Sequence, residues 1–176
     1  MPNVKEHQLL MKGPLVRATL AGLKTQTRRP IKPQPDDDIV AVRYDAIADL
    51  WLGNTPEDND LGYTSSWAER CPLGKAGDRL WVRETYKAWR KVGHESDEWE
   101  PIGVKAASFG DTIEYRATSK STGPWTPSIH MPRWACRLVL PLVSVRVERV
   151  QDITDEDAKA EGVEPVLMRG IGSYPE

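Results

Sequence analysis

The sequence predicts a mainly β protein with short α-helices, built as a small β-barrel with helical covers, in a single domain over residues 1–176. Short runs of alternating apolar and polar residues recur between clusters of turn residues, as in proteins made of short strands. Two brief segments instead show helical spacing. A chain of 176 residues with 39% hydrophobic content is long enough to bury one core.

The N-terminal part is expected to hold a short strand followed by a helix. The strand is expected over residues 9–13. Pro14 suits the first turn of a helix, and Leu20 and Leu23 continue its apolar face. Gly22 weakens the end of that helix, so the chain is expected to leave the helix there.

Alternation predicts further strands over residues 39–52, 79–85 and 112–117. In the second of these segments Leu80, Val82 and Glu84 share one face, and Trp81 points to the other.

The C-terminal half is more irregular. Residues 91–107 are expected to form a variable loop, and prolines exclude long regular structure from residues 125–134. The clearest strand is predicted over residues 136–149, with a bend at Pro141. A second helix follows, with Thr154 as its N-cap and acids in its first turn.

Charge and composition exclude some classes of function. A net charge of -2 and a pI near 6.0 argue against general binding of nucleic acid, because phosphate neutralisation dominates such affinity. A local basic groove remains compatible with these values. The sequence has 7 Trp and 1 Phe. Tryptophan side chains have large flat faces, which either fill the core or stack on bases.

The remaining composition points to a cytoplasmic protein without metal or cofactor. Cys71 and Cys136 lack the spacing of a metal site and are expected to be free thiols in a reducing compartment. No apolar run could cross a bilayer and no signal peptide is present, so no membrane partner is expected. His7 and His94 are expected at the surface.

The segment after the first helix carries the strongest chemical signal. It places Lys24, Thr27, Arg28 and Arg29 within a few residues. A threonine hydroxyl becomes a nucleophile when a neighbouring base takes its proton, and a lysine can do so if burial lowers its pKa. The competing interpretation is a solvated basic turn at the end of a helix.

Three blocks in order, residues 22–29 (GLKTQTRR), 77–84 (GDRLWVRE) and 153–162 (ITDEDAKAEG), resemble the ASCH-domain family. Residues 127–134 (PSIHMPRW) are similar to its phage and prophage branch. The resemblance implies a PUA-like β-barrel with a cleft beside the first helix. One branch of the family resembles RNA-binding modules, and a ribonuclease activity has been proposed for some relatives.

Another branch of the family comprises small amidohydrolases that remove the acyl group from N(4)-acetylcytidine with a lysine, a threonine and a glutamate. The resemblance places these on Lys24, Thr27 and Glu161. Lys24, kept neutral by burial or by a neighbouring arginine, would deprotonate Thr27 or a water molecule. Glu161 would protonate the departing nitrogen or hold Lys24, and these roles compete because a tight pair with Lys24 would raise the lysine pKa.

Five further residues are candidates for binding the substrate, and each also has a structural interpretation. Arg29 would stabilise the oxyanion or bind the pyrimidine carbonyl. Glu84 would contact the base edge or form a buried salt bridge with an arginine, and Trp81 would stack on the cytosine or pack in the core. His130 would line the pocket mouth or make a structural hydrogen bond. Arg133 would bind phosphate or ribose, or lie solvated.

The C-terminus departs from the family pattern. Family members continue into another helix and a closing strand, whereas this chain ends soon after Glu161. The barrel is therefore expected to be partly open, or to be covered in a homodimer. The expected partner is a modified nucleoside or base. An RNA-binding module and a ribonuclease remain the alternative functions.

Overall fold

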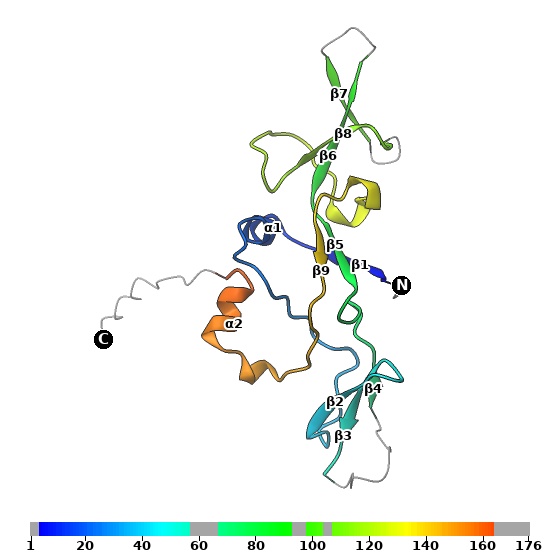
Figure 1. The fold of residues 1–176 in the computed structure, drawn as a ribbon. Coiled ribbons are helices and arrows are strands. Elements are labelled where there is room, and N and C mark those ends of the chain that lie inside the picture. Colours follow the sequence, from blue (N-terminus) through cyan, green and yellow to red (C-terminus); the bar gives the residue numbers. More distant parts are fainter. Residues whose placement is uncertain (1–3, 57–66, 93–97, 104–106, 164–176) are drawn as a thin grey trace, which may run out of the picture.

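The computed structural model describes residues 4–56, 67–92, 98–103 and 107–163. Within these residues the protein is mainly β, with three separate three-stranded sheets and a few short helices. Figure 1 shows the sheets following one another along an elongated molecule, with the sheet that contains β1, β5 and β9 in the middle. The mainly β class predicted from the sequence is confirmed.

The central sheet has the order β1-β5-β9, formed by β1 (Glu6–Leu10), β5 (Arg79–Arg83) and β9 (Val139–Pro141). β1 runs parallel to β5, and β9 runs antiparallel to it. Helix α1 (Gly13–Leu20) follows β1 and packs on the sheet. The buried core between them consists of Leu9, Met11, Val16, Leu80, Val82 and Ala117.

The two outer sheets are built from hairpins. One consists of β2 (Ala41–Asp45), β3 (Leu50–Asn54) and β4 (Ala68–Glu69), in that order. The other has the order β7-β6-β8, from β6 (Tyr86–Lys91), β7 (Trp99–Ile102) and β8 (Thr112–Tyr115). A second core lies beside β6 and contains Tyr86, Ala88, Met131 and Ala135.

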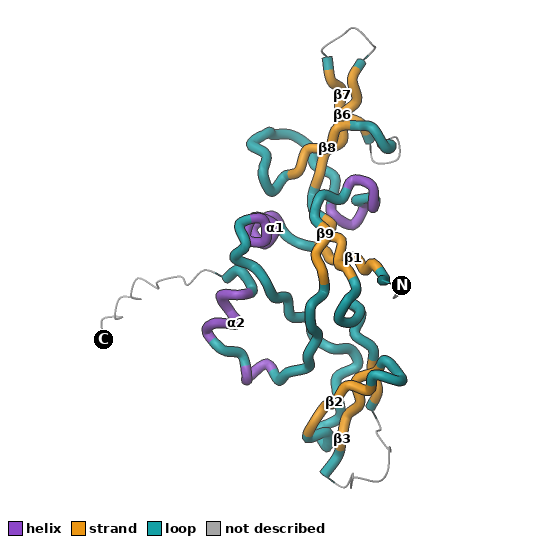
Figure 2. Tube along the Cα trace, in the orientation of Figure 1, coloured by secondary structure: helices purple, strands orange, loops and turns teal. Residues whose placement is uncertain are grey.

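The remaining elements are short helices in the C-terminal half. The single-turn 3₁₀ helices are Ser128–His130, Arg133–Ala135 and Val150–Asp152, and the α-helix is α2 (Asp155–Ala160). Figure 2 shows α1 and α2 on the same side of the central sheet, with a long non-helical segment leading from β9 to α2. None of the helices in the described part of the chain has the length and apolar content that a membrane span requires.

The described residues form no closed barrel, and the barrel expected from the sequence was one that is partly open or covered in a homodimer. The strands there pair into three sheets that share no ladder, so the sheets do not close on one another. The sequence was expected to lack a closing strand after Glu161. Residues 164–176, on which this expectation falls, lie outside the described residues. The same is true of His94.

The first strand and the first helix differ from their predicted bounds. The strand begins earlier, at Glu6, because the polar residues Glu6 and Gln8 pair with β5 while their side chains stay exposed. The helix ends at Leu20, so Leu23 lies beyond it and is 62% exposed rather than on an apolar helix face. Exposed polar residues on an edge strand weaken the alternation of apolar and polar residues. For this reason the strand was predicted to start only at Leu9, closer to the helix than it does.

The strand predicted over residues 136–149 is wrong over most of its length. Only Val139–Pro141 forms a ladder strand, extended by main-chain hydrogen bonds between Leu142 and residues 77–78. Beyond that point Val143 is 81% exposed, and no described strand pairs with residues 143–149. Alternation shows where a strand could bury one face, whereas pairing also requires a neighbouring strand.

The loop predicted over residues 91–107 contains a strand, β7, which pairs antiparallel with β6. Pro101 within it weakened the strand signal, but β7 lies at a sheet edge, where a missing N–H is tolerated. Residues 125–134 hold only single turns of 3₁₀ helix, in keeping with their prolines. Within the strand predicted over residues 79–85 the structure has β5 over Arg79–Arg83, and the Leu80 and Val82 side chains on one of its faces are buried.

Candidate active site

The candidate site lies where the chain leaving α1 meets the end of α2. The backbone N–H groups of Leu23 and Lys24 donate to the Ala18 carbonyl at the end of α1. The backbone N–H groups of Thr25 and Gln26 donate to the Ala160 carbonyl at the end of α2, at 2.8 and 2.9 Å. Main-chain hydrogen bonds therefore fix the basic segment between two helix ends that are far apart in the sequence.

Helix α2 is positioned by its own termini. Thr154 is its N-cap, as predicted, and forms a capping box with Asp157. After the helix, Gly162 adopts φ +78°, and a Cβ built there would lie 2.9 Å from Ala18 Cβ and 3.1 Å from Lys24 Cβ. Only glycine allows this close approach, which brings Glu161 beside Lys24.

The Lys24 side chain is buried, with only 7% of the residue exposed. Its Nζ donates to the backbone carbonyls of Gln26, at 2.5 Å, and Glu161, at 3.0 Å. Burial lowers the pKa of Lys24 and is the largest influence; the charge of Glu161 opposes it and that of Arg29 adds to it. Of the two means of lowering this pKa that the sequence left open, burial and a neighbouring arginine, burial has the larger influence.

The Glu161 carboxylate is held by Arg28 rather than by Lys24. Arg28 Nη1 lies 2.9 Å from Glu161 Oε1, and its Nη2 lies 3.1 Å from Asp157 Oδ2 and 3.2 Å from Glu148 Oε2. The hydrogen bond to Glu161 is the main cause that raises the pKa of Arg28. The main chain of Glu161 therefore contacts Lys24, while its side chain pairs with Arg28. Glu161 thus holds Lys24 without the tight carboxylate pair that would raise the lysine pKa.

Thr27 and Arg29 lie on the same segment and contact one another. Arg29 Nη1 donates to Thr27 Oγ1 at 3.1 Å and to the Arg28 carbonyl at 2.8 Å. Thr27 is half-buried and Arg29 is exposed. The two acceptors of Lys24 Nζ are carbonyls, so Lys24 and Thr27 are close in the chain without a direct hydrogen bond.

Of the other predicted site residues, Glu84 has the clearest partner. It is 1% exposed and accepts from Arg137 Nε and Nη2, both at 2.8 Å. This is the buried ion pair that the sequence analysis weighed against a contact to a base edge. Trp81 is half-buried, with the guanidinium carbons of Arg83 and Arg133 at 5.4 and 5.9 Å from its ring centroid.

Arg133 and His130 lie on the 3₁₀ turns and are exposed. Arg133 pairs with Glu6 through two contacts, at 2.8 and 3.0 Å. The His130 backbone carbonyl accepts from the Tyr86 hydroxyl at 3.2 Å. None of the hydrogen bonds of the described residues joins Trp81, Glu84, His130 or Arg133 to Lys24, Thr27 or Glu161, so the structure groups only the first block and the end of α2.

Two features of the site were missed by sequence reasoning. Arg28 and Asp157 form the ion-pair group around Glu161, and the only signal for Asp157 was its place three residues after the N-cap. A cavity of about 390 Å³ also lies near β2 and β3, and it shares no lining residue with the Lys24 group. No described residues form a group of three or more His, Cys, Asp and Glu that could hold a metal ion.

Comparisons with known protein families, with curated proteins and with solved structures give no match.

Proposed function

We propose that this protein is a cytoplasmic, PUA-like ASCH amidohydrolase that removes the acyl group from N(4)-acylated cytosine or cytidine without a cofactor. The observation that carries the proposal is the state of Lys24. Its amine is buried and donates to two backbone carbonyls, while the carboxylate of Glu161 pairs with Arg28. A lysine in this position has the properties of a general base.

The hydrogen bonds of Lys24 fit a neutral amine. A neutral amine has two N–H donors and one lone pair, and the carbonyls of Gln26 and Glu161 take up two donors. Burial disfavours the third proton of an ammonium group, which agrees with the lowered pKa of Lys24. The lone pair is then available for the proton of a nucleophile.

The proposed reaction uses Lys24 twice. Lys24 Nζ takes a proton from the Thr27 hydroxyl or from a water molecule, and the resulting oxygen attacks the acyl carbon. The carbon–N4 bond then breaks, and the proton held by Lys24 passes to N4, which leaves as the cytosine amine. With Thr27 as nucleophile the acyl group remains as an ester, which water hydrolyses in a second step.

Arg29 supports the same chemistry. Its Nη1, 3.1 Å from Thr27 Oγ1, is placed to stabilise negative charge on an oxygen formed next to that hydroxyl. Glu161 acts as a positioning residue, since its carbonyl binds Lys24 and its carboxylate binds Arg28. Because Lys24 and Thr27 share no hydrogen bond, the water route requires less rearrangement than attack by Thr27.

The test is the ultraviolet spectrum of N(4)-acetylcytidine over time with purified protein in the presence of a chelator. Wild type is expected to convert it to cytidine, Lys24→Met to lose this activity, and Lys159→Met, an exposed lysine on α2, to keep it. A bulkier acyl substrate, N(4)-benzoylcytidine, is run beside it.

Failure of wild type on both substrates would contradict the proposal. It would favour the alternative of an RNA-binding module, in which Lys24 and Arg29 contact RNA without turnover. Equal activity of wild type and Lys24→Met would instead remove Lys24 from the reaction.

A further inference from the structure

The cavity of about 390 Å³ lies between the β2–β3 hairpin, the turn before β5 and the segment after β9. It is separate from the Lys24 group, and the inference drawn from it does not rest on the proposed hydrolysis. Sites for small molecules commonly measure about 300–1,000 Å³ and combine apolar or aromatic walls with a few polar groups. A volume at the lower end of that range suits a ligand of the size of one nucleotide.

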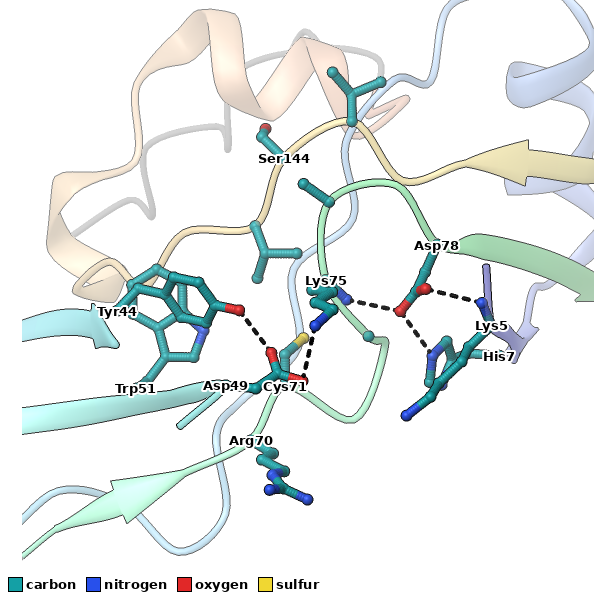
Figure 3. A pocket seen from close by; sticks show the side chains of 14 residues that line it. Lys5, His7, Tyr44, Asp49, Trp51, Arg70, Cys71, Lys75, Asp78 and Ser144 are labelled. Carbon is teal, nitrogen blue, oxygen red and sulfur yellow. Dashed lines mark hydrogen bonds and ion pairs between the residues drawn. The ribbon is translucent and has the colours of Figure 1, made fainter. Parts of the chain in front are cut away.

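One wall of the cavity is aromatic. Tyr44 and Trp51 are directly opposite in the antiparallel β2–β3 register, with ring centroids 5.3 Å apart and planes inclined by 47°. The Tyr44 hydroxyl lies 2.6 Å from Asp49 Oδ1, which fixes the ring and raises the pKa of the phenol. Figure 3 shows both rings at one end of the cavity, where a planar ligand could stack.

The two carboxylates that line the cavity are already occupied. Asp78 accepts from the backbone N–H groups of Lys5 and Lys75, at 2.9 and 3.2 Å, and its Oδ2 lies 3.2 Å from His7 Nε2. Asp49 binds the Tyr44 hydroxyl and lies 3.3 Å from Lys75 Nζ. These contacts hold the pKa of both carboxyl groups below the ordinary value.

The turn that binds Asp78 approaches the His7 and Asp78 side chains closely at Gly74. Gly74 has φ +91°, and a Cβ built there would lie 2.5 Å from His7 Nε2 and 2.6 Å from Asp78 Oδ2. Glycine is therefore required for this turn to approach the His7–Asp78 pair. His7, expected at the surface from the sequence, is instead half-buried in the cavity wall.

Cationic side chains remain in excess around the cavity. Lys5, Arg70 and Lys75 face two carboxylates, and no hydrogen bond joins the side chains of Lys5 or Arg70 to another described residue. Figure 3 shows Lys5 and Arg70 extending on the same side of the cavity, beyond Lys75. A guanidinium and an ammonium group on one side of an aromatic cavity provide donors for a phosphate.

We infer that this cavity binds a nucleoside monophosphate, with the base against Tyr44 and Trp51 and the phosphate between Lys5 and Arg70. Neither an uncharged nucleoside nor a free phosphate would use both parts of the cavity. Val143 and Val145 also line the cavity. Tyr44, Trp51 and Arg70 lie outside the three sequence blocks that resemble the ASCH-domain family. The proposed reaction at Lys24 therefore does not require this cavity.

The inference is tested by calorimetric titration of the full chain with cytidine 5′-monophosphate, cytidine and inorganic phosphate. Wild type is expected to bind the nucleotide more tightly than either part. Arg70→Ala should weaken binding of the nucleotide about tenfold with little effect on cytidine. Trp51→Leu should weaken both by about the same factor. Arg116→Ala, an exposed arginine that does not line the cavity, serves as the matched control.

Three results would overturn the inference. They are the absence of nucleotide binding to wild type, unchanged binding by Arg70→Ala, and binding of inorganic phosphate as tight as that of the nucleotide. Because Trp51 lies within β3, the circular dichroism of Trp51→Leu is compared with that of wild type, and Arg70→Ala alone decides if that variant does not fold. A 5′-phosphorylated oligocytidylate is run in parallel, and tighter binding of it than of the mononucleotide would assign the cavity to RNA and overturn the choice of ligand.

Discussion

Lys24 and Glu84 are both buried ionisable residues, yet their partners differ in kind. Glu84 is 1% exposed and receives two hydrogen bonds from Arg137, each of 2.8 Å. Lys24 is 7% exposed, and its amine donates to two backbone carbonyls. A buried charge with a bidentate partner stabilises the fold only as long as both partners remain, whereas a buried amine without such a partner shifts its pKa and becomes available for proton transfer.

The surroundings of the two residues fit this difference. Arg137, the partner of Glu84, also donates to Thr118 Oγ1 at 3.1 Å, and its guanidinium carbon lies 4.0 Å from the centroid of the Tyr115 ring. This ion pair therefore links the end of β5 to the chain around β8. Lys24 lies on a segment that is held by main-chain hydrogen bonds and by the ion pairs of Arg28, and the amine of Lys24 itself contacts carbonyls and no carboxylate.

The largest expected effect is on activity at Lys24. Replacement by Met keeps the aliphatic stem and removes the base, and loss of a general base reduces rates by about 10²–10⁴-fold. The free energy of unfolding should fall by about 1 kcal/mol, because the carbonyls of Gln26 and Glu161 lose their donor while no carboxylate loses its partner. Initial rates on N(4)-acetylcytidine and urea unfolding measure the two quantities. A variant that fails to fold would break the comparison with Glu84.

The next largest effect is on stability at Glu84. Glu84→Ala should lower the free energy of unfolding by about 3 kcal/mol, because Arg137 would be left partly buried without its carboxylate. The double variant Glu84→Leu with Arg137→Met should recover most of the loss, since both charges are then removed. Chemical denaturation measures both. An unchanged stability of Glu84→Ala, with weaker substrate binding, would restore the interpretation of Glu84 as a contact to a base.

A smaller effect is expected at the cap of α2, which positions Glu161. Thr154→Ala removes the hydroxyl that accepts from Asp157 N at 3.1 Å and should cost about 1 kcal/mol of stability. Thr154→Ser keeps the hydroxyl and should recover it. If thermal unfolding shows equal loss in both variants, the capping box does not hold α2.

The smallest effect is the pH dependence that Lys24 adds to stability. Its folded pKa lies below the ordinary value of 10.5, so the unfolded chain binds more protons between these two pKa values. Stability should therefore rise with pH through that window, since the cost of a buried ammonium group disappears as Lys24 deprotonates. Unfolding of wild type and Lys24→Met is compared up to about pH 10. Parallel curves would show that Lys24 contributes nothing to this slope.

Local patterns predicted part of the fold well. The N-cap at Thr154, the strand at β5 and the irregular residues 125–134 follow from rules that act over a few residues. The predicted strand beyond Pro141 failed, because alternating residues show a face but not the presence of a neighbouring strand. The described strands pair into three separate sheets, and the pairing of distant segments could not be predicted from the alternation within each segment.

Part of the predicted set, Lys24, Thr27, Arg29 and Glu161, lies together in the structure, whereas its contacts were not predicted. Trp81, Glu84, His130 and Arg133 share no hydrogen bond with that group among the described residues. The buried amine of Lys24 and its closeness to Glu161 agree with expectation. That Glu161 meets Lys24 through its carbonyl and Arg28 through its carboxylate depends on the approach of α2 to α1. The aromatic wall at Tyr44 and Trp51 was missed because cross-strand register cannot be obtained from the alternation of one strand.

The most direct test of the account is a nuclear magnetic resonance titration of the lysine side chains, with Lys24 assigned through its missing signal in Lys24→Met. The account predicts that Lys24 titrates below its ordinary value of 10.5, because burial outweighs the charge of Glu161. A Lys24 signal that titrates at or above that value would contradict the account. It would show an ammonium group held by Glu161, and Lys24 could not then act as the base.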